Sequence, residues 1–175
     1  KKASLKMPDK IFPVPKKSTL VPLISEEKYS ELYKLSIDNP NEFWGEQALS
    51  RLNWIQPFDN VLNTNMEKAK FEWFSNGKLN ACFNCVDKHL ENNGNDIAFI
   101  WESDDGSTSK QITYKELYEE VCRFSNLLKS RGIKKGDRVC IYMPMILEAI
   151  YSMLACARVG AVHSVVFGGF SVESL

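Results

Sequence analysis

Hydrophobic and polar positions along this chain follow two different periods, and the clearest helical period lies between residues 113 and 132. Apolar residues recur there at intervals of four, three and four: Leu117, Val121, Phe124 and Leu128. This spacing places them on one face of a helix. Thr113 and Glu116 have the spacing of a capping box, which begins a helix, and Gly132 is the type of residue that commonly follows the last turn. The pattern predicts an amphipathic helix here.

The next segment predicts a strand, a helix and a second strand. Residues 138–143 form an apolar run, residues 146–158 are apolar on most sides of a helix, and residues 161–166 form a second apolar run after Gly160. Buried apolar strands joined by a helix are typical of parallel pairing with a right-handed crossover. We therefore expect an α/β fold in this half of the chain, with both strands buried.

The pattern upstream predicts helices with short strands between them. Ser25 is a suitable N-cap for a helix over residues 25–38, and Asn39–Pro40 ends it. The other expected elements are a helix over residues 41–55, a polar stretch including residues 60–65, a short strand over residues 71–74, a turn at residues 75–77, a helix over residues 81–92 capped by Asn80, and a hairpin formed by residues 97–101 and 111–113.

Residues 1–24 are expected to form a separate arm. Four prolines among lysines block helix formation and favour an extended path: Pro8, Pro13, Pro15 and Pro22. One interpretation is a partly ordered arm. The other is an arm that lies across the domain surface and is anchored by its apolar residues: Ile11, Phe12, Val14, Leu20, Val21 and Leu23.

The end of the sequence predicts that more chain follows. Ser171 is a good N-cap and Glu173 would lie in the first helical turn, yet the sequence stops at Leu175. Two terminal parallel strands would also leave open sheet edges. We therefore expect this chain to be the N-terminal piece of a longer protein.

Composition and charge exclude several classes of function. The 22 Lys and Arg residues balance the 22 Asp and Glu residues, so the basic excess of a nucleic-acid binder is missing. The chain is 44% hydrophobic and 25% charged, as soluble globular proteins are. Its longest apolar stretch, residues 146–157, contains Glu148 and is too short to span a membrane. No apolar signal-peptide segment follows the first lysines, so we expect a cytoplasmic protein with no nucleic-acid or membrane partner.

Cys82 and Cys85 form a C-x-x-C pair with His89 four residues further on. One interpretation is part of a zinc site or a redox pair. A structural zinc ion needs a fourth ligand, and the three other cysteines are isolated in the sequence, at positions expected to face the core: Cys122, Cys140 and Cys156. We therefore favour two incidental helix cysteines and expect no metal site.

A glycine loop at residues 167–170 is the best candidate for a binding site. Phe167, Gly168, Gly169 and Phe170 follow the second predicted parallel strand, and open α/β sheets bind ligands beyond such strand ends. Glycine allows the backbone to approach a ligand closely. The alternative is a tight turn that requires glycine for its geometry. His163, a lone histidine inside the strand, is interpreted as structural rather than catalytic.

Several segments of the sequence resemble the acetyl-coenzyme A synthetase family of adenylate-forming enzymes. The most specific are GDRVCIYMPM at residues 136–145 and MLACARVGAVHSVVFGGFS at residues 153–171. Shorter similar segments lie upstream: Leu79–Asn80, residues 84–90, 100–105, 114–117 and 121–124, and Phe43–Trp44. The resemblance covers roughly residues 25–175.

This resemblance implies an enzyme that uses ATP, CoA and Mg²⁺. Members of the family join a carboxylate to the α-phosphate of ATP, releasing pyrophosphate, and then transfer the acyl group to CoA, releasing AMP. The family's phosphate loop, acyl pocket, ribose-binding Asp and catalytic Lys would all follow residue 175, so we expect no catalytic residue in this chain and no activity from it alone. The resemblance places Phe167, Gly168 and Gly169 at the nucleotide end of the CoA site.

The expected organisation has three parts: an arm over residues 1–24, a helical region typical of these synthetases over residues 25–92, and the incomplete start of the AMP-binding domain over residues 93–175. Acetate, ATP, CoA and the rest of the same polypeptide are the expected partners. The alternatives are a propionyl-CoA or other short-chain acyl-CoA synthetase, a non-enzymatic α/β binding module, and a metal or redox domain at Cys82 and Cys85.

Overall fold

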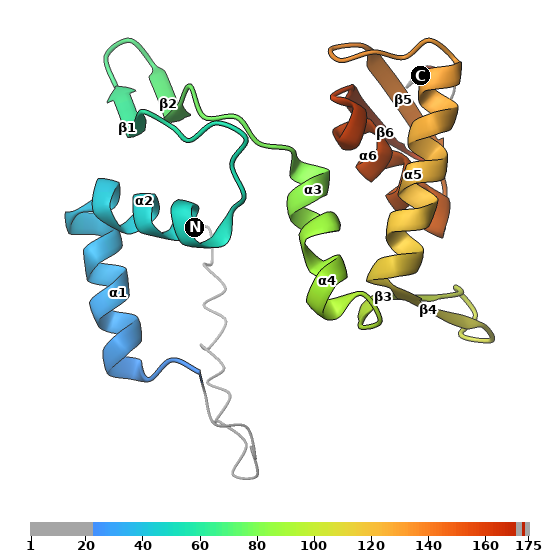
Figure 1. Cartoon of the computed structure of the whole chain (residues 1–175), viewed down its shortest axis with the longest axis horizontal. Helices are drawn as coiled ribbons and strands as arrows, with labels where there is room; N and C mark the ends of the chain where they lie inside the picture. Colours follow the sequence, from blue (N-terminus) through green and yellow to red (C-terminus); the bar gives the residue numbers. More distant parts are fainter. Residues whose placement is uncertain (1–22, 171–172, 174–175) are drawn as a thin grey trace, which may run out of the picture.

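The computed structural model describes residues 23–170 and 173. Its elements form two groups joined by residues 76–80 (Figure 1). The first group holds α1 (Glu26–Asp38), α2 (Pro40–Arg51), β1 (Asn60–Asn65) and β2 (Lys70–Ser75). The expected arm lies outside the described residues except for Leu23 and Ile24, which are exposed. The start of the helix expected at Ser171 also lies outside them.

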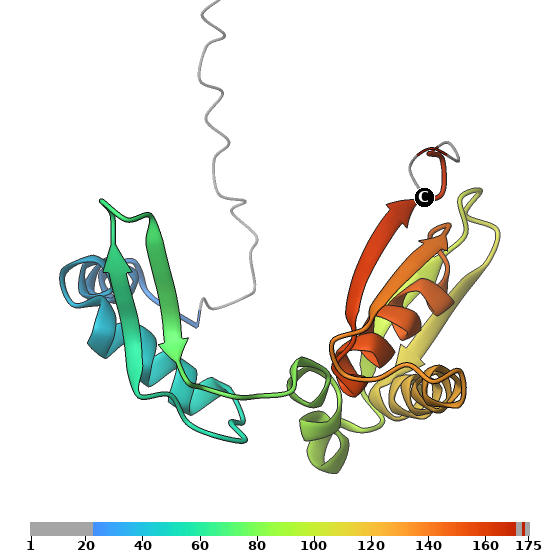
Figure 2. The same ribbon diagram turned by 90° about the horizontal axis from the view of Figure 1, so that it is seen from above.

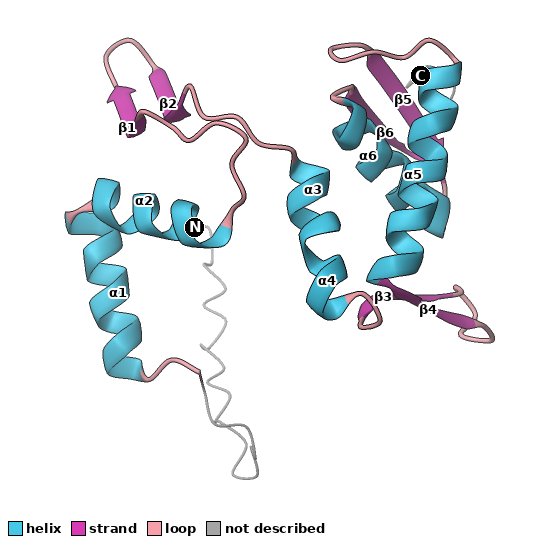
Figure 3. Ribbon diagram, in the orientation of Figure 1, coloured by secondary structure: helices cyan, strands magenta, loops and turns pink. Residues whose placement is uncertain are grey.

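The second group is a mixture of helices and strands, as Figure 3 shows by colour. In chain order its elements are α3 (Ala81–Cys85), a 3-10 turn (Asp87–His89), α4 (Leu90–Asn93), β3 (Ile97–Glu102), β4 (Ser109–Thr113), α5 (Tyr114–Ser130), β5 (Arg138–Met143), α6 (Leu147–Val159) and β6 (Val162–Phe167). The expected α/β class is therefore confirmed for the described residues.

The first two helices begin where the sequence predicts, but α2 ends four residues early. The Ser25 hydroxyl accepts a hydrogen bond from the Lys28 amide at 3.2 Å and caps α1. Beyond α2, Leu52 is extended, and the Asn53 amide donates to the side-chain oxygen of Asn84 at 2.8 Å. A partner 31 residues away thus takes the place of a further helical turn.

The polar stretch at residues 60–65 is a strand, which the sequence analysis missed. β1 pairs antiparallel with β2, from Asn60 opposite Ser75 to Asn65 opposite Lys70. Backbone pairing to β2 forms the strand, although its own residues are largely polar and exposed. The predicted turn after β2 is confirmed: Asn76 has a positive φ, and the Gly77 amide donates to the Phe74 carbonyl at 2.9 Å.

The helix predicted over residues 81–92 is broken. Asn80 caps α3 by accepting from the Phe83 amide at 3.1 Å, but the backbone leaves helical geometry at Val86. The break buries the Val86 side chain completely and brings Asp87 to Arg158 of α6. Packing and ion pairing therefore override the helical tendency of this segment.

The predicted hairpin and long helix are confirmed. β3 and β4 pair antiparallel. In the capping box, the Thr113 hydroxyl accepts from the Glu116 amide at 3.2 Å, and the Glu116 carboxylate accepts from the Thr113 amide at 2.8 Å. Gly132 follows α5 with a φ of 84°, a conformation that suits a residue without Cβ.

β5 and β6 pair in parallel, from Arg138 opposite Val162 to Met143 opposite Phe167, with α6 between them in the chain (Figure 2). This confirms the predicted pairing. The expectation that both strands are buried is wrong: β6 is largely exposed, with Val162 and Val165 each more than half accessible. Among the described residues, helices pack against one face of the β5–β6 pair, and no further strand pairs with the free edge of β6.

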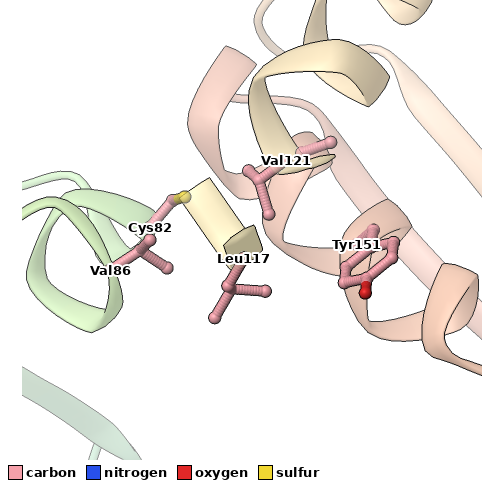
Figure 4. Packing of buried hydrophobic residues seen from close by; sticks show 6 residues of the cluster. Cys82, Val86, Leu117, Val121 and Tyr151 are labelled. Atoms are coloured by element: carbon pink, nitrogen blue, oxygen red, sulfur yellow. The ribbon is translucent and has the colours of Figure 1, made fainter. Parts of the chain in front are cut away.

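The main core lies between α3, α5 and α6 (Figure 4). Its buried residues are Cys82, Val86, Leu117, Val121, Tyr151 and Ala155. A second cluster places Cys156 of α6 and Ala161 against Ile141 of β5. The expectation that Cys140 faces the core is wrong, because it alternates with the buried Ile141 along β5 and is exposed. No helix of the described residues is long and apolar enough to cross a membrane.

Candidate functional site

The glycine loop lies directly beyond β6, where the parallel pair ends. Phe167 is the last residue of β6 and faces Met143, the last residue of β5. The Phe170 amide donates to the Phe167 carbonyl at 2.9 Å and closes a four-residue turn. The structure thus places the candidate residues Phe167, Gly168 and Gly169 at the strand end, where α/β sheets present ligand sites.

The two glycines are surrounded closely, but neither has a positive φ. A Cβ at Gly168 would lie 3.4 Å from both the Met143 carbonyl oxygen and the Pro144 nitrogen. A Cβ at Gly169 would lie 2.8 Å from a ring carbon of Phe167, closer than a carbon contact allows. A side chain at Gly169 would therefore have to move the exposed Phe167 ring, whereas one at Gly168 would meet backbone atoms at ordinary contact distance, and neither position needs glycine for left-handed backbone geometry.

Two aromatic rings flank the glycines and are open to solvent. The rings of Phe167 and Phe170 meet edge to face, with centroids 5.6 Å apart. Both side chains are more than half exposed. Exposed phenyl rings beside a bare stretch of backbone offer apolar and stacking contacts to a planar ligand. The four loop residues carry no charged side chain.

The Tyr142 side chain joins β5 to this loop. Its hydroxyl lies 3.2 Å from the Gly168 carbonyl oxygen and 3.1 Å from the Phe170 carbonyl oxygen, and its one proton can be donated to either. Sequence analysis missed this residue because Tyr142 belongs to an otherwise ordinary apolar strand. No local signal marks it, because the glycine loop follows β6 and its Gly168 lies 26 residues further along the chain.

An apolar groove of about 450 Å³ lies beside the loop. The groove is lined by Phe167 and Val165 of β6, and also by Trp101 of β3 and Met145. The Trp101 indole nitrogen donates to the Met145 carbonyl at 2.8 Å and ties the hairpin to the turn after β5. The groove is continuous with Phe167, so the loop borders a large apolar surface.

A second cavity, of about 400 Å³, lies between the two groups of elements. Asn53 and Trp54 line it from the first group, and Phe83, Asp87 and Arg158 line it from the second. The Arg158 guanidinium binds the Asp87 carboxylate through two hydrogen bonds, at 3.0 and 2.6 Å. Burial is the largest single influence and opposes the charge of Arg158, but the hydrogen bonds and charge of Asp87, together with Cys82 and Cys122, leave its pKa raised.

The structure separates the residues of the proposed C-x-x-C site. Cys82 is buried in the core whereas Cys85 is exposed, and the His89 ring packs against Tyr114, with centroids 4.8 Å apart. Burial raises the pKa of the Cys82 thiol to about 11, which disfavours the thiolate needed for metal binding or redox chemistry. Across residues 23–170 and 173, no three His, Cys, Asp or Glu side chains are arranged to hold a metal ion.

His163 lies on the exposed β6, where it is paired in register with Val139 of β5. It is three residues from the end of the strand and not part of the glycine loop. The structure therefore does not bring it together with Phe167, Gly168 and Gly169 as a single site.

Two family models match adjacent parts of the chain. The one described as acetyl-coenzyme A synthetase N-terminus matches residues 29–85, and the one described as AMP-binding enzyme matches residues 86–175. The chain belongs to the AMP-binding enzyme family. The two matches meet at Val86, the residue at which the structure breaks the predicted helix.

Curated relatives of this AMP-binding enzyme chain include two bacterial synthetases. Acetyl-coenzyme A synthetase 2 of Pseudomonas aeruginosa is 53% identical over 165 residues, which are 94% of this chain and 26% of the relative. Acetyl-coenzyme A synthetase of Parvibaculum lavamentivorans is 53% identical over 171 residues, which are 97% of this chain and 26% of the relative. The expected family resemblance is therefore confirmed, and the chain spans about a quarter of the length of these relatives.

The fold of this AMP-binding enzyme chain is similar to a solved synthetase. Acetoacetyl-CoA synthetase from Streptomyces lividans matches with a TM-score of 0.74 and 26% identity, over 83% of this chain and 22% of that chain. The structural match and the sequence matches thus point to the same family, and both agree with the α/β fold expected for this chain.

Proposed function

We propose that this chain is the N-terminal part of an AMP-forming acetate–CoA ligase. The observation that carries the proposal is 53% identity to acetyl-coenzyme A synthetases over 94–97% of the chain. The family match over residues 29–85, described as an acetyl-coenzyme A synthetase N-terminus, supports the same acid. No observation specifically supports either alternative, a propionate–CoA ligase or a non-enzymatic binding module. A cytoplasmic location stays a prediction.

The proposed reaction has two balanced steps. An acetate oxygen attacks the α-phosphorus of ATP, and the bond to the bridging oxygen breaks so that pyrophosphate leaves with its electron pair. The sulfur of deprotonated CoA then attacks the carbonyl carbon of acetyl-adenylate, and AMP leaves through its phosphate oxygen. Mg²⁺ would screen the phosphate charges. The described residues offer no cation site, so we assign no step of this chain to the metal.

We place the nucleotide end of CoA against Phe167, Gly168 and Gly169. The loop lies at a parallel strand end, both of its glycines are exposed, and its two phenyl rings are accessible. These features fit a planar base better than a phosphate, because the loop carries no charge. Cations that neutralise the phosphates of CoA would come from other parts of the enzyme.

We also propose the division into residues 1–24, 25–92 and 93–175. β3 starts at Ile97 and is the first strand of the second group, so a boundary just before it keeps all strands of that group in the AMP-binding domain. The boundary between the two family matches lies at residue 86, seven residues before the proposed domain boundary at residue 93.

The test compares the two half-reactions in the full-length parent enzyme carrying Gly169→Leu. A leucine at residue 169 would displace the Phe167 ring and any ligand on the loop. We expect acetate-dependent exchange of pyrophosphate into ATP to be retained and CoA-dependent acetyl transfer to fall. Gly106→Asn is the matched control, because Gly106 lies in an open hairpin loop with a positive φ that asparagine tolerates. Equal losses in both half-reactions, or none in either, would remove CoA from this loop.

A second arm of the same test uses residues 1–175 alone. We expect neither pyrophosphate exchange nor acetyl-CoA formation, since this part supplies no catalytic residue in our assignment. Exchange by this piece would contradict the proposed division of labour between it and the rest of the enzyme.

A further inference from the structure

We propose that Tyr142 is a positioning residue that holds the glycine loop in the conformation that receives CoA. This inference rests on the proposed function of the loop. Tyr142 is the penultimate residue of β5 and is paired in register with Val166, the residue before Phe167. Its side chain therefore starts from the strand beside β6, one residue before the level of Phe167.

The hydroxyl of Tyr142 reaches two carbonyl groups, and these flank Gly169. Its distances to the Gly168 and Phe170 oxygens are 3.2 and 3.1 Å. A phenol has one proton to donate, so the hydroxyl can donate a hydrogen bond to either carbonyl without moving. This places the carbonyl groups of the residues before and after Gly169 within reach of a single side chain. The turn adds its own bond, from the Phe170 amide to the Phe167 carbonyl.

A double-glycine loop has a particular need for such a tether. Glycine has more backbone conformations available than any other residue, and it loses more entropy when it is ordered. A loop that is ordered before the ligand arrives avoids this cost during binding. Gly168 is already close to the backbone of Met143 and Pro144, whereas Gly169 lies further along the turn, between the two carbonyls that Tyr142 engages.

The ring of Tyr142 and its hydroxyl have separable roles. Tyr142→Phe keeps the ring on β5 and removes only the donor. We expect the KM for CoA to rise about two- to tenfold, the size that one hydrogen bond supports. Acetate-dependent pyrophosphate exchange and the melting temperature of the full-length enzyme should stay unchanged. The matched control is Tyr33→Phe, the same chemical change on the exposed face of α1.

Measuring Tyr142→Phe and Gly169→Leu side by side distinguishes the two proposals. If Gly169→Leu impairs acetyl transfer but Tyr142→Phe leaves the KM for CoA unchanged, the positioning role is wrong and the loop assignment stands. If Tyr142→Phe lowers both half-reactions together or lowers the melting temperature, Tyr142 is only structural and the inference fails. If Gly169→Leu has no selective effect, the loop does not bind CoA and both proposals fail. A selective rise in the KM for CoA, together with a selective loss in Gly169→Leu, supports both.

Discussion

Asp87 and Arg158 lie 71 residues apart in the sequence and form a two-pronged ion pair between the 3-10 turn and α6. Both side chains are largely shielded from solvent. The Arg158 guanidinium also lies over the Tyr118 ring of α5, 5.1 Å from its centroid. The side-chain amide of Asn80 donates to the Arg158 carbonyl at 3.1 Å. These contacts fasten α3 and the turn after it to the helices of the α/β part.

Removing the Asp87 carboxylate should destabilise the chain. We expect Asp87→Ala to lower the free energy of unfolding by about 1–3 kcal/mol, because it leaves a shielded guanidinium without its partner. The urea midpoint is the measurement. Glu31→Gln, which breaks the exposed pair between Lys28 and Glu31, should change stability by less than about 0.5 kcal/mol. Equal effects of the two variants would contradict the role of the Asp87 pair.

Thr113→Ala should weaken the start of α5. The variant removes the hydroxyl that accepts from the Glu116 amide, and loss of such a cap costs about 0.5–2 kcal/mol. A shift of the urea midpoint at unchanged slope would show the loss. Thr113→Ser keeps the acceptor and should recover most of it, whereas an unshifted midpoint in the alanine variant would mean that the cap is unimportant for stability.

Glu116 should add a pH-dependent contribution to stability. The Thr113 amide, and then its hydroxyl, donate to the carboxylate and hold the pKa of Glu116 below its ordinary value of 4.5. A lowered pKa in the folded state stabilises the fold above that ordinary value, and the contribution is lost as the pH falls through the folded pKa. The stability difference between the wild type and Glu116→Gln should therefore shrink as the pH is lowered from above 4.5 through the lower pKa of the folded state. A difference that is constant with pH would contradict this.

When the folded chain is alkylated, exposed cysteines should react faster than buried ones. Cys85 and Cys140 are exposed, whereas Cys82 and Cys156 are buried, and burial raises the pKa of both buried thiols. We expect iodoacetamide to label Cys85 and Cys140 rapidly and the buried pair only after unfolding, as mass spectrometry of peptides can show. Added zinc should not protect Cys85. Protection by zinc, or early labelling of Cys82, would restore the metal or redox interpretation.

Local features of the sequence predicted the elements that local chemistry determines. The capping box at Thr113, the four-three-four spacing of α5 and Gly160 after α6 each depend on residues within one or two turns. The strand, helix and strand from Arg138 to Phe167 were predicted for the same reason: their apolar runs have the lengths of those elements. The glycine loop was found because its position after a strand can be read along the chain.

Only the tertiary structure decided what depends on residues far apart in the chain. β1 is largely polar and forms through pairing with β2. α2 ends shortly before Asn53, whose amide donates to the Asn84 side chain. The break at Val86 follows from core packing and from the ion pair of Asp87 with Arg158. The same holds at the candidate site. Sequence alone placed Phe167, Gly168 and Gly169 together, but the contact of Tyr142 with the carbonyls around Gly169 spans 26 and 28 residues. Such a contact has no signature in local periodicity, because it exists only once the parallel pairing of β5 and β6 sets the two segments side by side.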